Sequence, residues 1–110
     1  MRRVVITGLG IVSCIGNNKE EVLTSLRGQT SGIRYIPEYE DAGFRSHIAG
    51  RPQINPDDHI DRKQRRFMGD SAAYSYIALK EAIADAGLSE DMVSSPRTGL
   101  IAGSGGASSS

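Results

Sequence analysis

The sequence predicts an α/β protein, and three observations lead to this class. Residues 4–6 form an uncharged, β-branched run, and residues 98–103 form a second apolar run. Neither run alternates polar with apolar residues, which is typical of strands that are buried on both faces. Between them, residues 70–86 repeat small and apolar side chains at helical spacing. A helical crossover between two buried strands predicts a parallel pair within one sheet.

Two glycines follow the first predicted strand. Gly8 and Gly10 stand two residues apart, and glycine at such a place lets another segment of backbone come close. The pattern is also similar to the start of a dinucleotide-binding motif. That motif needs a third glycine at position 13, where this chain has Ser13. We therefore do not expect nucleotide binding, and we interpret the apolar residues 11–15 as more strand.

A first helix is predicted over residues 19–27. Asn18 can cap this helix, and Glu21, three residues later, completes a capping-box pair. The residues that follow, 29–58, are broken repeatedly by proline and glycine and show no periodicity. We expect an irregular segment there, with a short strand at residues 46–49.

The second helix, over residues 70–86, is predicted to begin at a cap made by Asp70 or Ser71 and to stop at Gly87. Because small side chains dominate it, we expect this helix to pack closely on more than one side. The connector after Gly87 is predicted to make one further helical turn before the second strand.

Composition narrows the classes of function. The 110 residues suit one small domain, and thirteen basic residues balance thirteen acidic ones. Such a balance gives no sign of nucleic-acid or membrane binding. A single cysteine excludes a disulfide framework, and the sequence shows neither a transmembrane run nor a signal-peptide pattern. We therefore expect a cytoplasmic protein.

Two buried strands are too few for a stable sheet. We therefore expect the chain to be the N-terminal piece of a larger α/β protein. The alternative is a complete small domain that ends in a flexible tail rich in glycine and serine.

Few residues are candidates for chemistry. Cys14 lies in an apolar run without a neighbouring lysine or arginine, so we interpret it as a buried, inert cysteine. His47 and His59 are the only histidines, and neither has partners at metal-ligand spacing. We expect no metal site and no cofactor, and the residues alone predict no catalytic centre.

The strongest charge feature is the run Arg62-Lys63-Gln64-Arg65-Arg66. On a helical turn, Arg62, Arg65 and Arg66 fall on one side. Two interpretations remain open at this point: a solvated surface, or a docking patch for an acidic partner. Nucleic acid is the less favoured partner, because no aromatic residue is interleaved in the run and the rest of the chain is not basic.

The order of motifs along the whole chain resembles the β-ketoacyl-acyl-carrier-protein synthases, and the synthase I type in particular. The motifs that carry this resemblance are Val4-Val5-Ile6-Thr7-Gly8-Leu9-Gly10-Ile11-Val12-Ser13, Ile15-Gly16-Asn17-Asn18, Ser31-Gly32-Ile33, Arg45-Ser46-His47, Ile60-Asp61-Arg62-Lys63, Arg66-Phe67-Met68, Ala82-Ile83-Ala84-Asp85-Ala86-Gly87-Leu88 and Gly99-Leu100-Ile101-Ala102-Gly103-Ser104-Gly105-Gly106. Each motif is weak alone, but together they stand in one register.

The resemblance implies a thiolase-like fold with α/β/α/β/α layers, of which residues 1–110 are the N-terminal portion, in a homodimeric enzyme. It implies decarboxylative Claisen condensation in fatty acid elongation, with acyl- and malonyl-loaded acyl-carrier protein as partners. The catalytic cysteine, two histidines and lysine of the family are expected beyond residue 110. No residue of this chain is therefore assigned a catalytic role, and the piece alone is expected to be inactive.

The resemblance carries two sites over to this chain. Arg62, Lys63 and Arg66 match the basic patch that meets the acyl-carrier protein, whereas Arg65 has no counterpart in that role and is expected to matter less. Gly105 and Gly106 match a loop that approaches the acyl pocket. The alternative function is a non-catalytic module that docks an acidic partner through residues 62–66.

Overall fold

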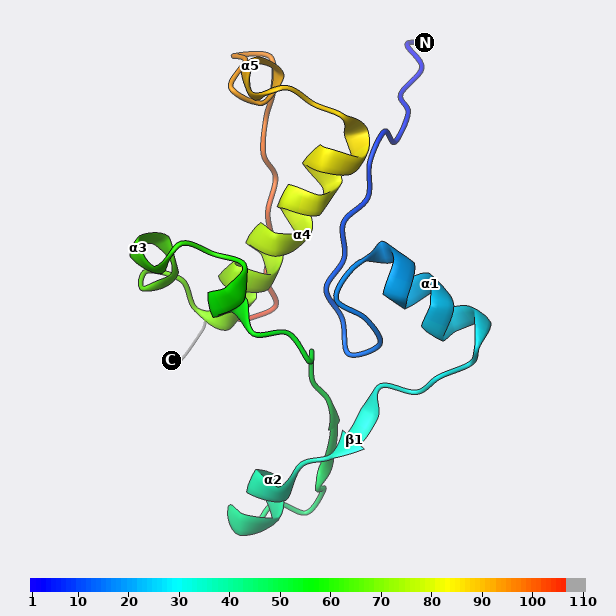
Figure 1. The fold of residues 1–110 in the computed structure, drawn as a ribbon, viewed down its shortest axis with the longest axis vertical. Coiled ribbons are helices and arrows are strands. Elements are labelled where there is room, and N and C mark those ends of the chain that lie inside the picture. Colours follow the sequence, from blue (N-terminus) through cyan, green and yellow to red (C-terminus); the bar gives the residue numbers. More distant parts are fainter. Residues whose placement is uncertain (107–110) are drawn as a thin grey trace. The chain divides into compact units, whose positions relative to one another are not determined.

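The computed structural model describes residues 1–106, and Figure 1 shows their elements. In chain order these are α1 (Lys19–Arg27), β1 (Ile33–Tyr35), α2 (Pro37–Asp41), β2 (Ile48–Gly50), the 3₁₀ helix η1 (Pro56–Asp58), α3 (Arg62–Arg65), α4 (Asp70–Ala86) and α5 (Glu90–Val93). The chain divides into two compact units. One unit comprises residues 11–54, and the other comprises residues 1–10 together with the chain from residue 55 onward.

The unit of residues 11–54 contains the two-stranded sheet. Strands β1 and β2 are antiparallel, with Arg34 opposite Ala49 at the centre of the register. The Ile36 amide extends the pairing, because it donates a hydrogen bond to the His47 carbonyl at 2.6 Å. The expectation of an irregular segment over residues 29–58 is therefore wrong in part. Only the short strand near residues 46–49 had a signal in the sequence, and it lies at Ile48–Gly50.

Helix α1 confirms the prediction for residues 19–27. The Asn18 side chain accepts a hydrogen bond from the Glu21 amide at 3.0 Å. The Glu21 carboxylate reaches back to the Asn17 amide at 2.7 Å, one residue before the cap itself. Two amides that the helix cannot satisfy are bonded in this way. The helix buries Val22, and Ile36 and Ile54 are the other buried apolar residues of this unit.

Residues 11–15 do not form the strand expected for them. Ser13 and Gly16 instead exchange two backbone hydrogen bonds, of 2.9 and 3.3 Å. Cys14 and Ile15 are left at the corner of a tight turn. Their apolar character predicts a strand, but the turn signal of Gly16 in the sequence prevails over it.

Helix α4 dominates the other unit and spans the residues predicted for it. Gly87 follows the helix in the left-handed conformation, at φ 66° and ψ 29°. The amides of Gly87 and Leu88 donate to the carbonyls of Ala84 and Ile83, which closes the helix end. The predicted N-terminal cap is wrong, because Gly69 precedes the helix and supplies no side-chain cap. The further turn predicted after Gly87 is helix α5.

The first ten residues run along α4 (Figure 1). A Cβ atom added at Gly8 would lie 2.3 Å from the Ala82 carbonyl oxygen, and one added at Gly10 would lie 1.7 Å from that of Ala78. The Leu9 amide between the two glycines donates to Asp85 Oδ2 at 3.0 Å. The close approach that the glycines predict is thus confirmed, and the alanine face of α4 is what they approach.

The two predicted buried strands are absent from residues 1–106. Val4 is 92% exposed and Ile101 is 99% exposed, and neither segment pairs with another strand. A strand is held by hydrogen bonds to its neighbours, which local sequence cannot supply. Residues 4–6 and 98–103 therefore have the composition of buried strands but, within the described residues, no sheet to join.

The glycine contact with α4 generates a test on the purified protein. The substitution Gly10→Ala should lower the free energy of unfolding by about 1 to 3 kcal/mol, because the added methyl group overlaps the helix backbone. Gly28→Ala is the matched control. A Cβ at Gly28 meets its nearest atom at 3.3 Å and the residue has ordinary helical φ, so the change should stay within about 0.5 kcal/mol. Equal effects in urea unfolding would contradict the contact.

Candidate functional site

Helix α3 carries the basic run. Asp61 begins the helix by accepting a hydrogen bond from the Lys63 amide at 2.7 Å. Arg62, Lys63 and Arg66 are exposed, and within residues 1–106 none of the three makes an ion pair. We call these three residues the α3 patch. A surface of unpaired cations of this kind attracts a negatively charged partner.

Arg65 does not join the α3 patch, although helical spacing places it beside Arg62 and Arg66. Its side chain is only 24% exposed, and its Nε lies 3.1 Å from Asp57 Oδ1. Its Nη2 donates to Asp70 Oδ1 at 3.1 Å, and its Nη1 donates to the Met68 carbonyl. The expectation of a shared face is wrong for Arg65, because two carboxylates from flanking elements draw it inward.

These contacts fix α3 against its neighbours. Asp57 belongs to η1, and Asp70 is the first residue of α4, so Arg65 joins three elements of one unit. A second connection runs from Tyr76 of α4, whose hydroxyl donates to Gln64 Oε1 at 3.3 Å. Figure 1 shows α3 beside the start of α4. The α3 patch is thus presented by a helix that is held on its inner side.

An aromatic ring adjoins the α3 patch. The guanidinium carbon of Arg66 lies 4.5 Å from the centre of the Phe67 ring, within the range of a cation–π contact. Phe67 is 78% exposed. The sequence shows Phe67 directly after the basic run, but adjacency alone gave no reason to include it in the site.

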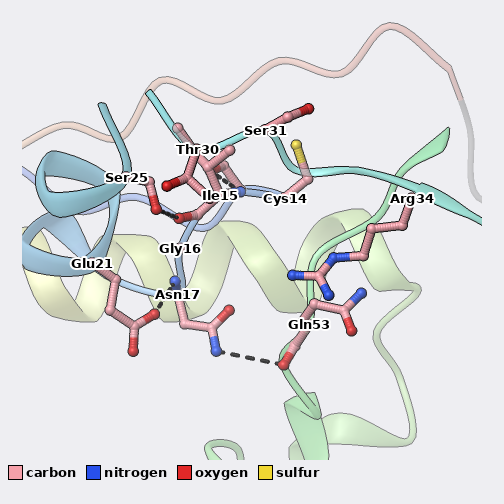
Figure 2. Close-up of a pocket in the computed structure, with 11 residues that line it drawn as sticks. Cys14, Ile15, Gly16, Asn17, Glu21, Ser25, Thr30, Ser31, Arg34 and Gln53 are labelled. Carbon is pink, nitrogen blue, oxygen red and sulfur yellow. Dashed lines mark hydrogen bonds between the residues drawn. The ribbon is translucent and has the colours of Figure 1, made fainter. Parts of the chain in front are cut away.

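Cys14 lies at the turn corner and is partly exposed rather than buried. Its neighbours are backbone: a Cβ added at Gly32 would lie 2.8 Å from the Cys14 sulfur, and one at Gly50 would lie 2.9 Å from it. In Figure 2 the thiol points toward the segment that carries Ser31. Arg34 lines the same small hollow as Cys14, but no histidine does. We therefore interpret the surroundings of the thiol as packing.

The histidines are not brought together with Cys14. His47 Nε2 lies 2.8 Å from the Phe44 carbonyl oxygen, and its ring meets that of Tyr35 edge to face. His59 ends η1 in the other unit. Among residues 1–106, no three histidine, cysteine or acidic side chains are grouped to hold a metal ion. In the same part of the chain, no helix is long and apolar enough to cross a bilayer.

A small polar hollow of about 170 Å³ lies beside the turn of residues 13–16. Figure 2 shows the side-chain amide of Asn17, whose Nδ2 donates to the Gln53 carbonyl at 3.5 Å, with the Arg34 side chain alongside. Glu21 lines the same hollow, and its carboxylate already accepts a hydrogen bond from the backbone amide of Asn17. Asn17, Glu21 and Gln53 are thus occupied with one another, and we assign no chemistry to this hollow.

Residues 100–104 run beside α4 and leave an apolar groove of about 740 Å³. Leu79 and Tyr76 lie on the helix side of this groove, and Leu100 and Ile101 lie on the other. The glycine loop follows at once: Gly105 and Gly106 form an exposed bend, closed by the Ser104 hydroxyl, which donates to the Gly106 carbonyl at 2.7 Å. Ala107 lies outside the described residues.

Comparison with known proteins identifies the family of this chain. A family model described as beta-ketoacyl synthase, N-terminal domain, matches residues 1–110. The chain belongs to the β-ketoacyl synthase family. The resemblance found in its motifs is confirmed.

Three relatives illustrate the similarity of this chain to known proteins. It is 61% identical over 105 residues to the 3-oxoacyl-[acyl-carrier-protein] synthase 1 of Haemophilus influenzae, which covers 96% of this chain and 26% of that protein. It is 55% identical over 109 residues to the 3-oxoacyl-[acyl-carrier-protein] synthase 1 of Escherichia coli strain K12, and this match covers 98% of this chain and 27% of that protein. Synthase 2 of Staphylococcus aureus strain COL is 35% identical over 105 residues, covering 94% and 25%. The chain thus spans about a quarter of the length of these curated relatives, and it is more similar to the two synthases of type 1.

The contacts of Arg65 generate a prediction for α3. Arg65→Ala should weaken the attachment of α3 by about 1 to 3 kcal/mol, because hydrogen bonds to charged groups are lost. Hydrogen exchange at the amides of Gln64, Arg65 and Arg66 should accelerate accordingly. Arg62→Ala removes an exposed cation from the same helix and should leave these exchange rates unchanged. Equal acceleration in the two variants would contradict the role of Arg65.

The surroundings of Cys14 generate a prediction about its reactivity. In the full-length protein, Cys14→Ala should lower the free energy of unfolding by only about 1 kcal/mol. Mass spectrometry after incubation with an acyl thioester should find no acyl group on Cys14. Stoichiometric acylation at this residue would show that the packing role is wrong.

Proposed function

We propose that the full-length protein is a β-ketoacyl-acyl-carrier-protein synthase of the synthase I type. It condenses an acyl group, held as a thioester on the enzyme, with malonyl-acyl-carrier protein, which loses carbon dioxide as the carbon–carbon bond forms. The single observation that carries this proposal is 55–61% identity, over nearly the whole chain, to proteins named 3-oxoacyl-[acyl-carrier-protein] synthase 1. We assign none of the bond-making residues to residues 1–110.

We propose a thiolase-like layered fold for the full-length protein, which we expect to be a cytoplasmic homodimer. In that fold residues 4–6 and 98–103 would join the parallel sheet that their composition favours. Their exposure in residues 1–106 supports this, because β-branched runs of that kind are stable only when covered. α4 would then be the helix that covers this part of the sheet.

The α3 patch is proposed to bind the acyl-carrier protein. Its support is physical: three exposed cations stand on a helix whose fourth cation, Arg65, fixes its position. Exposed complementary charges act mainly on the rate of encounter and on orientation. The α3 patch would therefore deliver the substrate and take no part in the bond-making step.

Gly105 and Gly106 are proposed to lie beside the acyl pocket. Both residues lack a Cβ, and among the described residues no atom beyond the adjoining residues lies within 4 Å of where one would be. The apolar groove of residues 100–104 leads to this bend. A loop without side chains would leave room for the acyl chain.

Charge reversal tests the α3 patch. In the full-length enzyme, Lys63→Glu with Arg66→Glu should raise KM for the carrier-bound substrate and change kcat at saturation less. The effect should shrink as salt rises, because the screening length falls from about 10 Å at 0.1 M to about 3 Å at 1 M. A small acyl thioester without the carrier should react almost as before.

The control for this experiment is Arg97→Glu, which reverses an exposed cation of the same unit outside α3. Arg65→Glu cannot serve, because Arg65 holds α3 in place. If the double reversal slowed the carrier-free thioester as much as the carrier-bound one, the α3 patch would support the fold or the active site, and the docking role would be wrong.

A further inference from the structure

The Arg66–Phe67 pair adds an apolar element to the α3 patch. Arg66 covers one face of the ring at 4.5 Å, and the rest of the ring remains open, with 78% of the residue exposed. The runs at residues 4–6 and 100–101 are also exposed, but they are extended apolar segments with the composition of strands. Phe67 is different, because it directly follows the surface helix α3, and Gln64, Arg66 and Asp70, which are near it in the chain, are exposed polar residues.

The backbone that carries the ring is held in a turn. The Phe67 amide donates to the Gln64 carbonyl at 3.1 Å, and the next amide, of Met68, donates to the Arg65 carbonyl at 3.0 Å. The Met68 carbonyl is itself held by Arg65 Nη1. The turn that carries Phe67 is therefore attached to the same arginine that positions α3.

We propose that Phe67 is a docking residue that gives the α3 patch an apolar contact with its partner. The partner surface would then present a carboxylate beside an exposed apolar side chain. This inference rests on the proposed function and specifies the chemistry of the carrier-protein surface that the α3 patch accepts. Charge complementarity selects an acidic partner, since the three cations of the α3 patch have no counter-ion within residues 1–106.

The contact between Arg66 and Phe67 would let the two side chains bind the partner together. A guanidinium that lies over a ring keeps its N–H donors at its edge, where they remain available for a carboxylate. The ring shields one face of the guanidinium from water, and charge-assisted hydrogen bonds strengthen when water is excluded. Arginine and aromatic residues beside one another are also typical of the few residues that dominate binding at an interface.

The experiment measures KM of the full-length enzyme for acyl-carrier-protein substrate at about 0.1 M and about 1 M salt. Phe67→Ala should raise this KM by about tenfold, which corresponds to about 1.4 kcal/mol. The factor should be similar at both salt concentrations, because apolar burial is not screened, whereas the effect of Lys63→Glu with Arg66→Glu should shrink. Phe67→Leu, which keeps apolar area, should lie between the native enzyme and Phe67→Ala.

Phe44→Ala is the matched control, because Phe44 is the other phenylalanine of the chain and is 56% exposed. It should leave KM unchanged. The proposal is overturned, with the α3 patch intact, if charge reversal raises KM and Phe67→Ala does not. It is also overturned if Phe67→Ala slows a carrier-free thioester equally or lowers the thermal midpoint more than Phe44→Ala, since the ring would then belong to the core. If neither charge reversal nor Phe67→Ala changes KM, the proposed docking site fails as well.

Discussion

The close contact between the glycine segment and helix α4 is the constraint on which the rest of its unit depends. Side chains at positions 8 and 10 would overlap the carbonyl oxygens of Ala82 and Ala78. The Asp85 carboxylate pins the amide between them. A backbone can approach a helix so closely only where both surfaces are reduced to glycine and alanine. α4 thereby becomes the fixed element, and Ala73 is the most completely buried residue along it.

The candidate site takes its position from α4. Asp70, the first residue of α4, binds Arg65, and Tyr76, farther along α4, binds Gln64. α3 is too short to be stable alone, because an isolated helix of a single turn does not recover the entropy of its nucleation. The two contacts from α4, with the ion pair to Asp57, hold it instead. One arginine that faces inward thus lets the other cations face outward without losing their orientation.

The sequence predicts those elements of the fold that are determined by interactions between residues close together in the chain. The capping pair of Asn18 and Glu21 and the left-handed Gly87 mark helix ends through contacts a few residues long, and both helices lie where predicted. The strands at residues 4–6 and 98–103 needed partners that local sequence cannot identify. Of the paired strands, only β2 was predicted from the sequence and β1 was not, because the pairing brings together segments that α2 separates in the chain.

The candidate site also has features that the sequence predicts and features that it does not. A run of charge is visible in a sequence, so the four cations of residues 62–66 could be found in advance, and the family resemblance singled out Arg62, Lys63 and Arg66. Spacing alone could not separate Arg65 from its neighbours, because the difference comes from Asp57 and Asp70 on adjacent elements. The contribution of Phe67 depends on how the Arg66 guanidinium folds over the ring, which adjacency in the chain does not determine.

We propose that the full-length protein meets an acidic carrier protein at α3. Zero-length carbodiimide crosslinking tests it most directly, because Lys63 is the only lysine of the α3 patch and the chain otherwise has only Lys19 and Lys80. The enzyme and acyl-carrier protein would be crosslinked and the joined peptides sequenced by mass spectrometry. Our account predicts a dominant bond between Lys63 and a carboxylate of the carrier, which fades at about 1 M salt. Crosslinks through Lys19 or Lys80, or through lysines elsewhere in the enzyme, with Lys63 unmodified would contradict it.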